Sequence, residues 1–325
     1  MSRQGWFFRS LRAARDLTRF RIPAHLNSRL RHISLEATEK FRQRLLEFRQ
    51  EAVGGAAADD EDLQNHLFRR LDDNRRQVVP WLDAARSLDG AAVLEIGCGT
   101  GSATVALAEQ GARVTAVDLD PRAIRVAEER CRLYGVEATF FAANAAELSG
   151  PIAEQRFDFI LFFASLEHMT HPERMAAMAR TWQMLPPGGL WGVIETPNRL
   201  WYYDHHTAHL NFFLWLSDEL AADYVRFSPR DDVREQIGGA ENRPLALCRA
   251  GRGVSFHEFD LALGPSRNLN VVSSMPLFYR QRDLALRLQW RLSRDCRFER
   301  FLAELCADLH RGFLQPTLYL LIRKP

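Results

Sequence analysis

The chain has 325 residues, of which 46% are hydrophobic and 26% charged, a balance typical of a globular protein with a sizeable core. No apolar run approaches the ~18 residues that a membrane-spanning helix needs, and the net charge of +2 gives no reason to expect a specific nucleic-acid partner. The five cysteines are widely spaced and form no Cys-x-x-Cys pair, which argues against a disulfide framework or a zinc site and favours a cytoplasmic protein with reduced thiols.

The N-terminal segment, residues 1–62, is basic and is expected to form helices, as a cap or an arm beside a domain that spans residues 63–325. Residues 1–50 carry twelve basic and four acidic side chains. Such a segment can pack over a sheet with a solvated face, or make weak contact with a membrane surface through residues 1–31. Aromatic residues 6–8 are followed at once by arginine, so no signal peptide is expected. All but two of the 43 basic residues are arginine, which suggests a GC-rich bacterial genome.

Strands and helices are expected to alternate from residue 92 onwards. Before that point, residues 54–58 predict a linker and residues 63–88 a helical stretch that is interrupted at Pro80. The short apolar runs that follow are typical of strands in a doubly wound parallel sheet. The expected strands are 92–96, 113–118, 138–142, 157–163 and 190–196, and the expected helices between them are 102–110, 121–134 and 172–185.

The alternation is lost after residue 196. We expect a helix opened by Ser217, two final strands over residues 256–263 and 317–322, and between them a long arginine-rich helical segment over residues 277–311. This part of the chain therefore holds additions to the sheet.

The most informative motif is the glycine-rich turn that follows the first expected strand. Glycines let backbone amides approach a ligand closely, and the helix that follows adds partial positive charge. Asp118 stands twenty-one positions after Gly97, at the end of the second strand, where a carboxylate can bind both ribose hydroxyls of an adenosine. A dinucleotide fingerprint would have its third glycine at position 102, which is Ser102, whereas this chain has Gly101.

The spacing Gly97-x-Gly99-x-Gly101, preceded by Glu95, resembles the first motif of class I S-adenosylmethionine-dependent methyltransferases. Further stretches in the family's order support the resemblance, which covers about residues 80–200. They are Asn144-Ala145 after the third strand, residues 157–168 over the fourth strand and its loop, and residues 185–189 in the turn into the fifth. The resemblance implies a Rossmann-like, doubly wound sheet of seven strands with the last one antiparallel, cap insertions at about residues 198–250 and 265–312, and S-adenosylmethionine as cofactor.

The resemblance also implies roles for single residues. The glycine turn would line the methionine moiety, and Glu95 would orient that turn or reach the amino group through water. Asp118 would bind the ribose, and Asn144, where the family more often has aspartate, would accept from the adenine amino group. The residues expected to contact the cofactor are Glu95, Gly97, Cys98, Gly99, Gly101, Asp118, Leu119, Asn144, Ala145, Phe163 and Ala164.

A stretch rich in aromatic residues and histidine, residues 196–209, follows the fifth strand at the sheet edge where ligands bind. It resembles a pattern of bacterial methyltransferases that act on sugars, lipids and natural products. His205, His206 and His209 are candidate general bases, with His168 as a further candidate, and packing against the neighbouring aromatic rings is the alternative. His205 and His209 would share a helix face as zinc ligands do, but no carboxylate or cysteine completes a set, so no metal is expected.

The predicted function is therefore that of an enzyme that methylates a hydroxyl oxygen on a sugar, lipid or specialised metabolite, with a small molecule, glycan or peptide as acceptor. Methyl esterification of a carboxylate on a peptide or small acid is the alternative. A nicotinamide oxidoreductase and a non-catalytic S-adenosylmethionine-binding module are the other classes that the glycine turn allows. Neither the acceptor nor the oligomeric state follows from the sequence.

Overall fold

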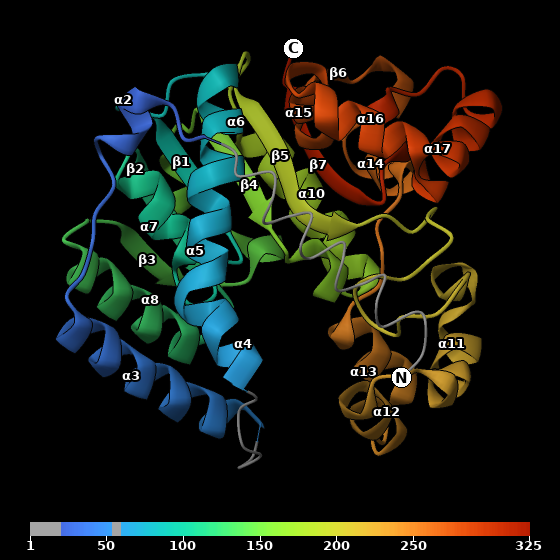
Figure 1. Cartoon of the computed structure of the whole chain (residues 1–325), viewed down its shortest axis with the longest axis horizontal. Coiled ribbons are helices and arrows are strands. Elements are labelled where there is room, and N and C mark those ends of the chain that lie inside the picture. The colour runs from blue at the N-terminus through green and yellow to red at the C-terminus, as the bar shows by residue number, and fades with distance from the viewer. Residues whose placement is uncertain (1–20, 54–59) are drawn as a thin grey trace.

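A seven-stranded mixed sheet forms the centre of the computed structural model, which describes residues 21–53 and 60–325 (Figure 1). The strand order is β3-β2-β1-β4-β5-β7-β6. Strands β1 to β5 are parallel, and β7 runs antiparallel between β5 and β6, which confirms the expected Rossmann-like sheet with its last strand reversed. The strands are β1 (Ala92–Ile96), β2 (Arg113–Asp118), β3 (Thr139–Ala142), β4 (Phe159–Phe163), β5 (Leu190–Pro197), β6 (Asn270–Ser274) and β7 (Thr317–Arg323).

Both faces of the sheet are covered, so its central strands are apolar throughout. All five residues of β4 are buried. Neighbouring residues of β1 point to opposite faces: Val93 belongs to one buried cluster and Leu94 to the other. The helices α6 (Val79–Ala85), α7 (Ser102–Ala108) and α8 (Pro121–Tyr134) contribute to the first cluster, and α10 (His171–Met184) and α14 (Phe256–Ala262) to the second.

The helices between the strands begin and end where their capping residues stand. Asp120 caps α8 by accepting a hydrogen bond from Arg122 N, Pro121 occupies the first turn, and Gly135 ends the helix in the left-handed conformation. Helix α10 begins with a capping box formed by Thr170 and Glu173. These helices therefore begin and end within two residues of the expected positions.

The expected helix break at Pro80 is wrong. The helix is continuous from residue 60 to residue 85, through α4 (Asp60–Gln64), a π-helical turn η1 (Asn65–Arg69), α5 (Arg70–Asp73), a second π-helical turn η2 (Asn74–Val78) and α6. Proline removes one helical donor. The Tyr279 hydroxyl donates instead to carbonyl oxygens in the turn before Pro80, at 2.7 Å from Gln77 O and 3.4 Å from Arg76 O.

Two further helices precede this long one, α2 (Ala24–Asn27) and α3 (Leu35–Val53). Phe41 and Leu45 of α3 are buried against Val126 of α8. The N-terminal residues 1–20 and the expected linker at 54–58 lie outside the described residues. The expected division of the chain at residue 62 stays a prediction.

The C-terminal third corrects two expectations. Residues 256–263 do not form a strand: Ser255 and Glu258 make a capping box that starts α14, and β6 comes later. The expected long helix over 277–311 is three helices, α15 (Met275–Arg282), α16 (Leu284–Leu292) and α17 (Arg294–Leu305). The side chains of Asp283 and Ser293 cap the second and third of these, which divides the segment.

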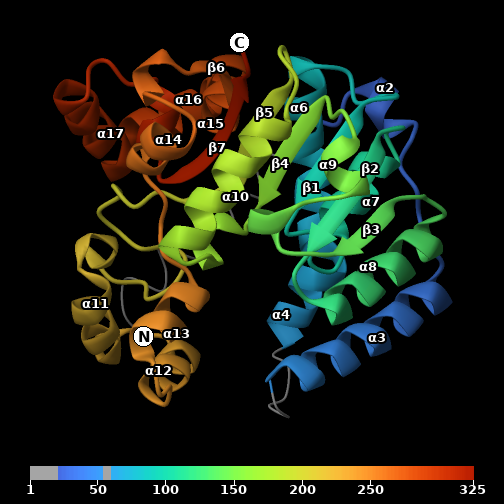
Figure 2. The same cartoon turned by 180° about the vertical axis from the view of Figure 1, so that it is seen from behind.

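A small helical group fills the first insertion and packs around its own buried cluster. It consists of α11 (Asp218–Tyr224), opened as expected by Ser217, with α12 (Asp231–Gly238) and α13 (Arg243–Ala250). Figure 2 shows this group on one side of the molecule and α3 and α4 on the other. The remaining short elements are α9 (Pro151–Glu154) and the 3-10 turns η3 (Ala145–Glu147), η4 (Leu166–His168), η5 (Phe213–Trp215), η6 (Val225–Phe227), η7 (Ser266–Asn268) and η8 (Arg311–Leu314). Within residues 21–53 and 60–325, no helix has both the length and the apolar character that crossing a bilayer requires.

Candidate functional site

A cavity of about 640 Å³ lies at the carboxyl ends of β1, β2 and β4, where doubly wound sheets bind their ligands. Its floor is formed by the glycine turn after β1 and by Asp118 at the end of β2. The long N-terminal helix forms another wall with His66, Arg70 and Asn74, and Arg249 of α13 reaches it from the first insertion.

The glycine turn fits closely into its surroundings. Gly97 has a φ of +80°, and a Cβ atom there would lie 2.6 Å from Cβ of Ser165, so a side chain would push β4's loop away. Gly99 has open space around the position of a Cβ atom and lines the cavity. Gly101 differs from the expectation that it lines the methionine moiety, because it packs against Ala127 of α8 and is not among the residues that line the cavity.

The carboxylate of Asp118 is held in place by two backbone amides. Its Oδ2 accepts from Gly99 N at 2.8 Å and its Oδ1 accepts from Asp120 N at 2.9 Å. Burial raises the pKa of Asp118 above its ordinary value. Each oxygen keeps a lone pair for a ribose hydroxyl. The next residue, Leu119, is 71% exposed although it is apolar, and it lines the same cavity, as a side chain that contacts an adenine ring would.

Glu95 lies fully buried beneath the glycine turn. Its Oε2 accepts from the Thr104 hydroxyl at 2.7 Å, whereas its Oε1 has no hydrogen-bond partner among the described residues. Burial raises the pKa of Glu95 to about 8. An unpaired buried acceptor beside a cavity suits the amino group of a ligand such as S-adenosylmethionine.

The expected adenine residues follow β3. The Asn144 side-chain oxygen accepts from Ala146 N at 3.0 Å, which fixes the side chain and leaves a second lone pair for an adenine amino group. Ala145 lines the cavity beside it, and Phe163 and Ala164 line the cavity at the end of β4. The residues present therefore fit S-adenosylmethionine: an anchored carboxylate, an exposed leucine, and a buried acceptor near a glycine turn.

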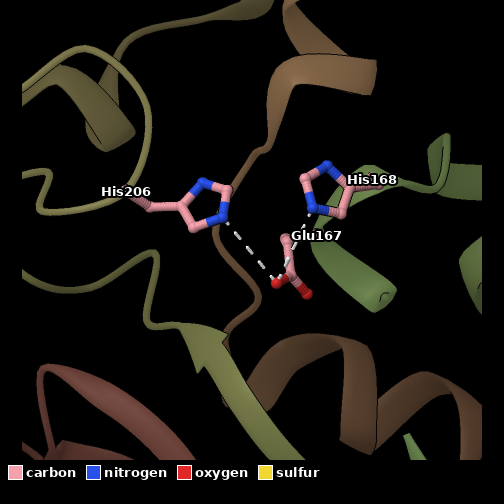
Figure 3. Close-up of side chains that lie close together, drawn as sticks. All are labelled: Glu167, His168 and His206. Carbon is pink, nitrogen blue, oxygen red and sulfur yellow. Dashed lines mark ion pairs between the residues drawn. The ribbon is translucent and has the colours of Figure 1, made fainter. Parts of the chain in front are cut away.

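A second group of side chains lies beyond the end of β4. Glu167 and His168 come from η4, and His206 comes from the loop after β5; Figure 3 shows both imidazole rings directed toward the same carboxylate. Glu167 Oε1 is 4.0 Å from His168 Nε2 and 4.0 Å from His206 Nε2. Glu167 is fully buried, while the side chains of His168 and His206 are 40% and 32% exposed. His168 lines the cavity, so this group, the Glu167 cluster, borders the same space.

Burial controls the charge of the Glu167 cluster. It raises the pKa of Glu167 to about 8 and lowers the pKa of His168. It also lowers the pKa of His206 to about 4, with the His168 ring as a further cause. All three side chains are therefore uncharged near neutral pH in the protein alone.

The other two histidines lie elsewhere. His205 packs edge-on against the ring of Tyr203, with 4.6 Å between centroids, and neither His205 nor His209 lines the cavity. Residues 199–212 form a loop, so His205 and His209 do not share a helix face. The carboxylate of Asp204 organises that loop by accepting from three successive backbone amides, those of residues 206, 207 and 208, and does not orient an imidazole.

Glu167 does not line the cavity itself, but it joins His168, its neighbour in the chain, to His206 from a distant loop. The helix residues His66, Arg70 and Asn74 line the cavity and were not expected from the sequence. Their four-residue spacing places polar side chains on one helix face, a signal present in the sequence. Two π-helical turns, which often mark functional sites, accompany that face.

Comparison with known proteins identifies the family. A family model described as "Methyltransferase domain" matches residues 93–189. The "Ubiquinone biosynthesis O-methyltransferase" of Burkholderia pseudomallei (strain 1710b) is 33% identical over 208 residues, 64% of this chain and 86% of that protein. The protein of the same name from Pseudomonas entomophila (strain L48) is 33% identical over 122 residues, 38% of this chain, and the chain spans 51% of its length. The chain belongs to the S-adenosylmethionine-dependent methyltransferases, as its motifs predicted, and S-adenosylmethionine is the family's cofactor.

A solved structure is also similar to part of the chain. It is the magnesium protoporphyrin IX methyltransferase (ChlM) from Synechocystis PCC 6803 with bound SAH, at 22% identity and a TM-score of 0.37. The similarity covers 50% of this chain and 74% of that one.

Proposed function

We propose that this methyltransferase transfers the methyl group of S-adenosylmethionine to a hydroxyl oxygen of a small-molecule acceptor. The observation that carries the proposal is the position of the Glu167 cluster, whose His168 borders the cavity that the cofactor residues line. When bound, S-adenosylmethionine supplies the methyl group and, as a sulfonium, a good leaving group. The protein has to orient the two reactants and to remove the acceptor proton.

The floor of the cavity would hold the cofactor. Asp118 would bind the ribose hydroxyls, Leu119 would contact adenine, and Asn144 would accept from the adenine amino group. Glu95 Oε1, which has no partner among the described residues, would accept from the methionine amino group directly or through water. This arrangement would direct the methyl carbon toward the end of β4, where Phe163 and Ala164 line the cavity.

The Glu167 cluster would receive the acceptor proton. An alkyl or sugar hydroxyl is a poor nucleophile at neutral pH, and a correctly placed base accelerates its reaction by about 10²–10⁴. His168 and His206 are uncharged near neutral pH and can accept a proton. Of the four candidate histidines, His168 lines the cavity, which supports a base in its cluster and not in the pair His205 and His209.

An oxygen acceptor is supported by the names of the relatives, which are O-methyltransferases. Within that class, a hydroxyl on a sugar, lipid or specialised metabolite is the proposal. A carboxylate is already ionised near neutral pH and needs no base. A buried carboxyl group and two imidazoles in a cluster that reaches the cavity through His168 favour the hydroxyl.

The experiment uses the full chain, cell extract and S-adenosylmethionine with a labelled methyl group. Labelled product is isolated and treated with mild alkali, which hydrolyses a methyl ester to methanol and leaves a methyl ether intact. A hydroxyl acceptor predicts label that stays on the product. Release as methanol would support carboxyl methylation, and tight cofactor binding without any labelled product would indicate a non-catalytic binding module.

A further inference from the structure

The Glu167 cluster brings one carboxyl oxygen and two imidazole nitrogens together, and no hydrogen bond joins them. His168 Nε2 and His206 Nε2 both face Glu167 Oε1 at 4.0 Å (Figure 3). That oxygen is fully buried and has no hydrogen-bond partner among the described residues. A buried polar atom without a partner is costly, and such an atom in a native protein indicates a missing partner.

The hydrogen bonds that each imidazole makes on the side away from Glu167 determine which ring nitrogen carries no hydrogen. His168 Nδ1 lies 2.8 Å from the carbonyl oxygen of Arg249, which can only accept, so Nδ1 carries the proton. His206 Nδ1 lies 3.1 Å from the Thr207 hydroxyl, whose single hydrogen is donated to Gly251 O at 2.7 Å. The hydroxyl must therefore accept from Nδ1–H. In both neutral rings Nε2 has a free lone pair, and both lone pairs face the carboxylate.

We propose that Glu167, His168 and His206 bind a divalent transition-metal ion, with Zn²⁺ and Mn²⁺ as the candidates, which takes up the acceptor hydroxyl. This inference rests on the proposed function and specifies how the acceptor is bound and activated. Two imidazoles and one carboxylate are donors that these ions favour, and three protein ligands leave open positions, as in catalytic metal sites.

The geometry and the surroundings fit such a site. Metal bonds to histidine nitrogen and carboxylate oxygen are about 2.0–2.2 Å long, so two ligand atoms 4.0 Å apart can both reach one ion between them. Hydrogen bonds from the outer ring nitrogens to carbonyl and hydroxyl oxygens are the usual support of metal-binding histidines. The second carboxylate oxygen of Glu167 also has support, from the Thr196 hydroxyl at 3.4 Å.

The absence of a side chain at Gly251 leaves room for the His206 ring. A Cβ atom at residue 251 would lie 2.6 Å from both Cε1 and Nδ1 of the His206 ring, and its φ of +127° disfavours any side chain. The backbone between α13 and α14 thus approaches the ring as closely as glycine allows. The ring is held from one side and directed toward Glu167 on the other.

A cation at this position would lower the pKa of an acceptor hydroxyl. With the ion bound, Nε2 of His168 and of His206 would be occupied as ligands, so solvent water would take the place of the imidazoles as the base. The O–H bond would break and its proton would pass to that water. The new O–C bond then forms as the S–C bond of S-adenosylmethionine breaks, with the electron pair remaining on sulfur. No oxidant or reductant is needed.

The test is calorimetric titration of the full chain, first stripped with a chelator, with ZnCl₂ and separately with MnCl₂. We expect one ion per chain for at least one of the two metals. Glu167→Gln and His206→Gln should each weaken binding by at least tenfold. His205→Gln, in the same loop but outside the cluster, is the matched control and should bind as the wild type does.

Each variant is also titrated with S-adenosylhomocysteine, to show that its cofactor cavity is intact. If His206→Gln or Glu167→Gln does not fold, His168→Gln at a partly exposed side chain and Gly251→Ala, which displaces the His206 ring, give the same comparison. A wild-type protein that binds neither metal, or equal binding by wild type and cluster variants, overturns the metal site. Metal binding that depends on the cluster, without methyl transfer to any hydroxyl, supports the site and contradicts the proposed function instead.

Discussion

The carboxylate of Asp204 fixes the position of His206 by accepting a hydrogen bond from its backbone N–H at 2.9 Å. The same carboxylate accepts from the amides of Thr207 at 3.0 Å and Ala208 at 2.6 Å. Asp204, Thr207 and Ala208 are all buried, so the amides of residues 207 and 208 have no water as an alternative partner. One acidic residue therefore shapes the loop that brings a histidine to the Glu167 cluster.

Replacement of Asp204 should accordingly affect both stability and activity. Asp204→Ala leaves three amides without their acceptor, and we expect the free energy of unfolding to fall by about 2–4 kcal/mol. Chemical denaturation measures this loss, with His205→Gln as a control that should change it by less than about 0.5 kcal/mol. An Asp204→Ala protein as stable as the wild type would show that the loop does not depend on this carboxylate.

The histidines should separate into two pairs in methyl transfer. His168→Gln and His206→Gln are expected to lower the rate by about 10²–10⁴, because the acceptor proton is removed at their cluster. His205→Gln and His209→Gln should lower it by less than tenfold. The rates are measured once an acceptor has been found, at saturating cofactor, together with S-adenosylhomocysteine binding. Losses below tenfold for all four variants would favour a carboxylate acceptor.

Asp118 should determine the affinity for the cofactor. Asp118→Ala removes two acceptor oxygens from the ribose site, and we expect S-adenosylmethionine binding to weaken by about 1.5–3 kcal/mol, which is tenfold or more. Titration calorimetry gives the dissociation constant. Asp120→Asn is the matched control, because Asp120 caps α8 and pairs with Arg122 outside the residues that line the cavity. Unchanged affinity in Asp118→Ala, or binding of NAD by the wild type, would contradict the assignment.

Glu95 predicts a dependence of stability on pH. Its pKa rises from about 4.5 to about 8 on folding because the side chain is buried. Between these two values the unfolded chain gives up the proton and the folded protein keeps it, so the free energy of unfolding falls as the pH rises from about 4.5 to about 8. Each unit of pKa difference between the folded and unfolded states corresponds to about 1.4 kcal/mol, so the free energy of unfolding falls by a few kcal/mol in all.

The variant Glu95→Gln has no proton to lose at this position. Its free energy of unfolding, from chemical denaturation at a series of pH values, should therefore decline less steeply than that of the wild type between about pH 5 and pH 8. Parallel curves for the two proteins would show that the pKa of Glu95 is not raised by folding.

Helix α3 should contribute to stability through Phe41. Phe41 is 2% exposed and packs with Leu45 against α8. The centroid of its ring lies 4.5 Å from the Cζ atom of the buried Arg130 guanidinium. Phe41→Ala is expected to cost about 3–5 kcal/mol. Leu35→Ala, on the same helix at 90% exposure, is the control and should cost little.

Deletion of residues 1–60 tests the expected division of the chain. The sequence predicts that the remaining domain folds and binds the cofactor but methylates poorly. Because the deletion also removes Phe41 and Leu45 from their contact with α8, the shortened protein should be less stable than the full chain. Insoluble protein, or loss of S-adenosylhomocysteine binding, would instead assign α3 to the core of the methyltransferase domain.

The sequence predicted well the strands that carry the expected cofactor residues, because these strands depend on neighbours in the chain. The strands β1 and β2 occupy the predicted residues 92–96 and 113–118, and both end at the edge that lines the cavity. An apolar run, a glycine turn and a helix start are local patterns, and a parallel sheet then brings the ends of successive strands to one edge. The family itself could be predicted from these patterns.

Secondary structure was predicted wrongly at two places where the local sequence pattern competed with a hydrogen bond. Residues 256–263 are apolar enough for a strand, yet Ser255 and Glu258 cap the start of a helix there. The proline at residue 80 predicted a break that the Tyr279 hydroxyl, about two hundred residues later, compensates. In both cases a hydrogen bond outside the apolar pattern determined the backbone.

The sequence by itself determined the five parallel strands, the glycine turn and the position of Asp118, because each follows from side chains within a few residues of one another. Only the tertiary structure decided which distant histidine meets Glu167. His206 meets Glu167 because Asp204 holds the loop after β5 and because Gly251 admits the ring. The Asp204 contact is local, whereas the contacts of His206 with Glu167 and with Gly251 join segments about 40 residues apart. Such contacts depend on how loops pack over the sheet, and hydrophobic periodicity carries no information about that packing.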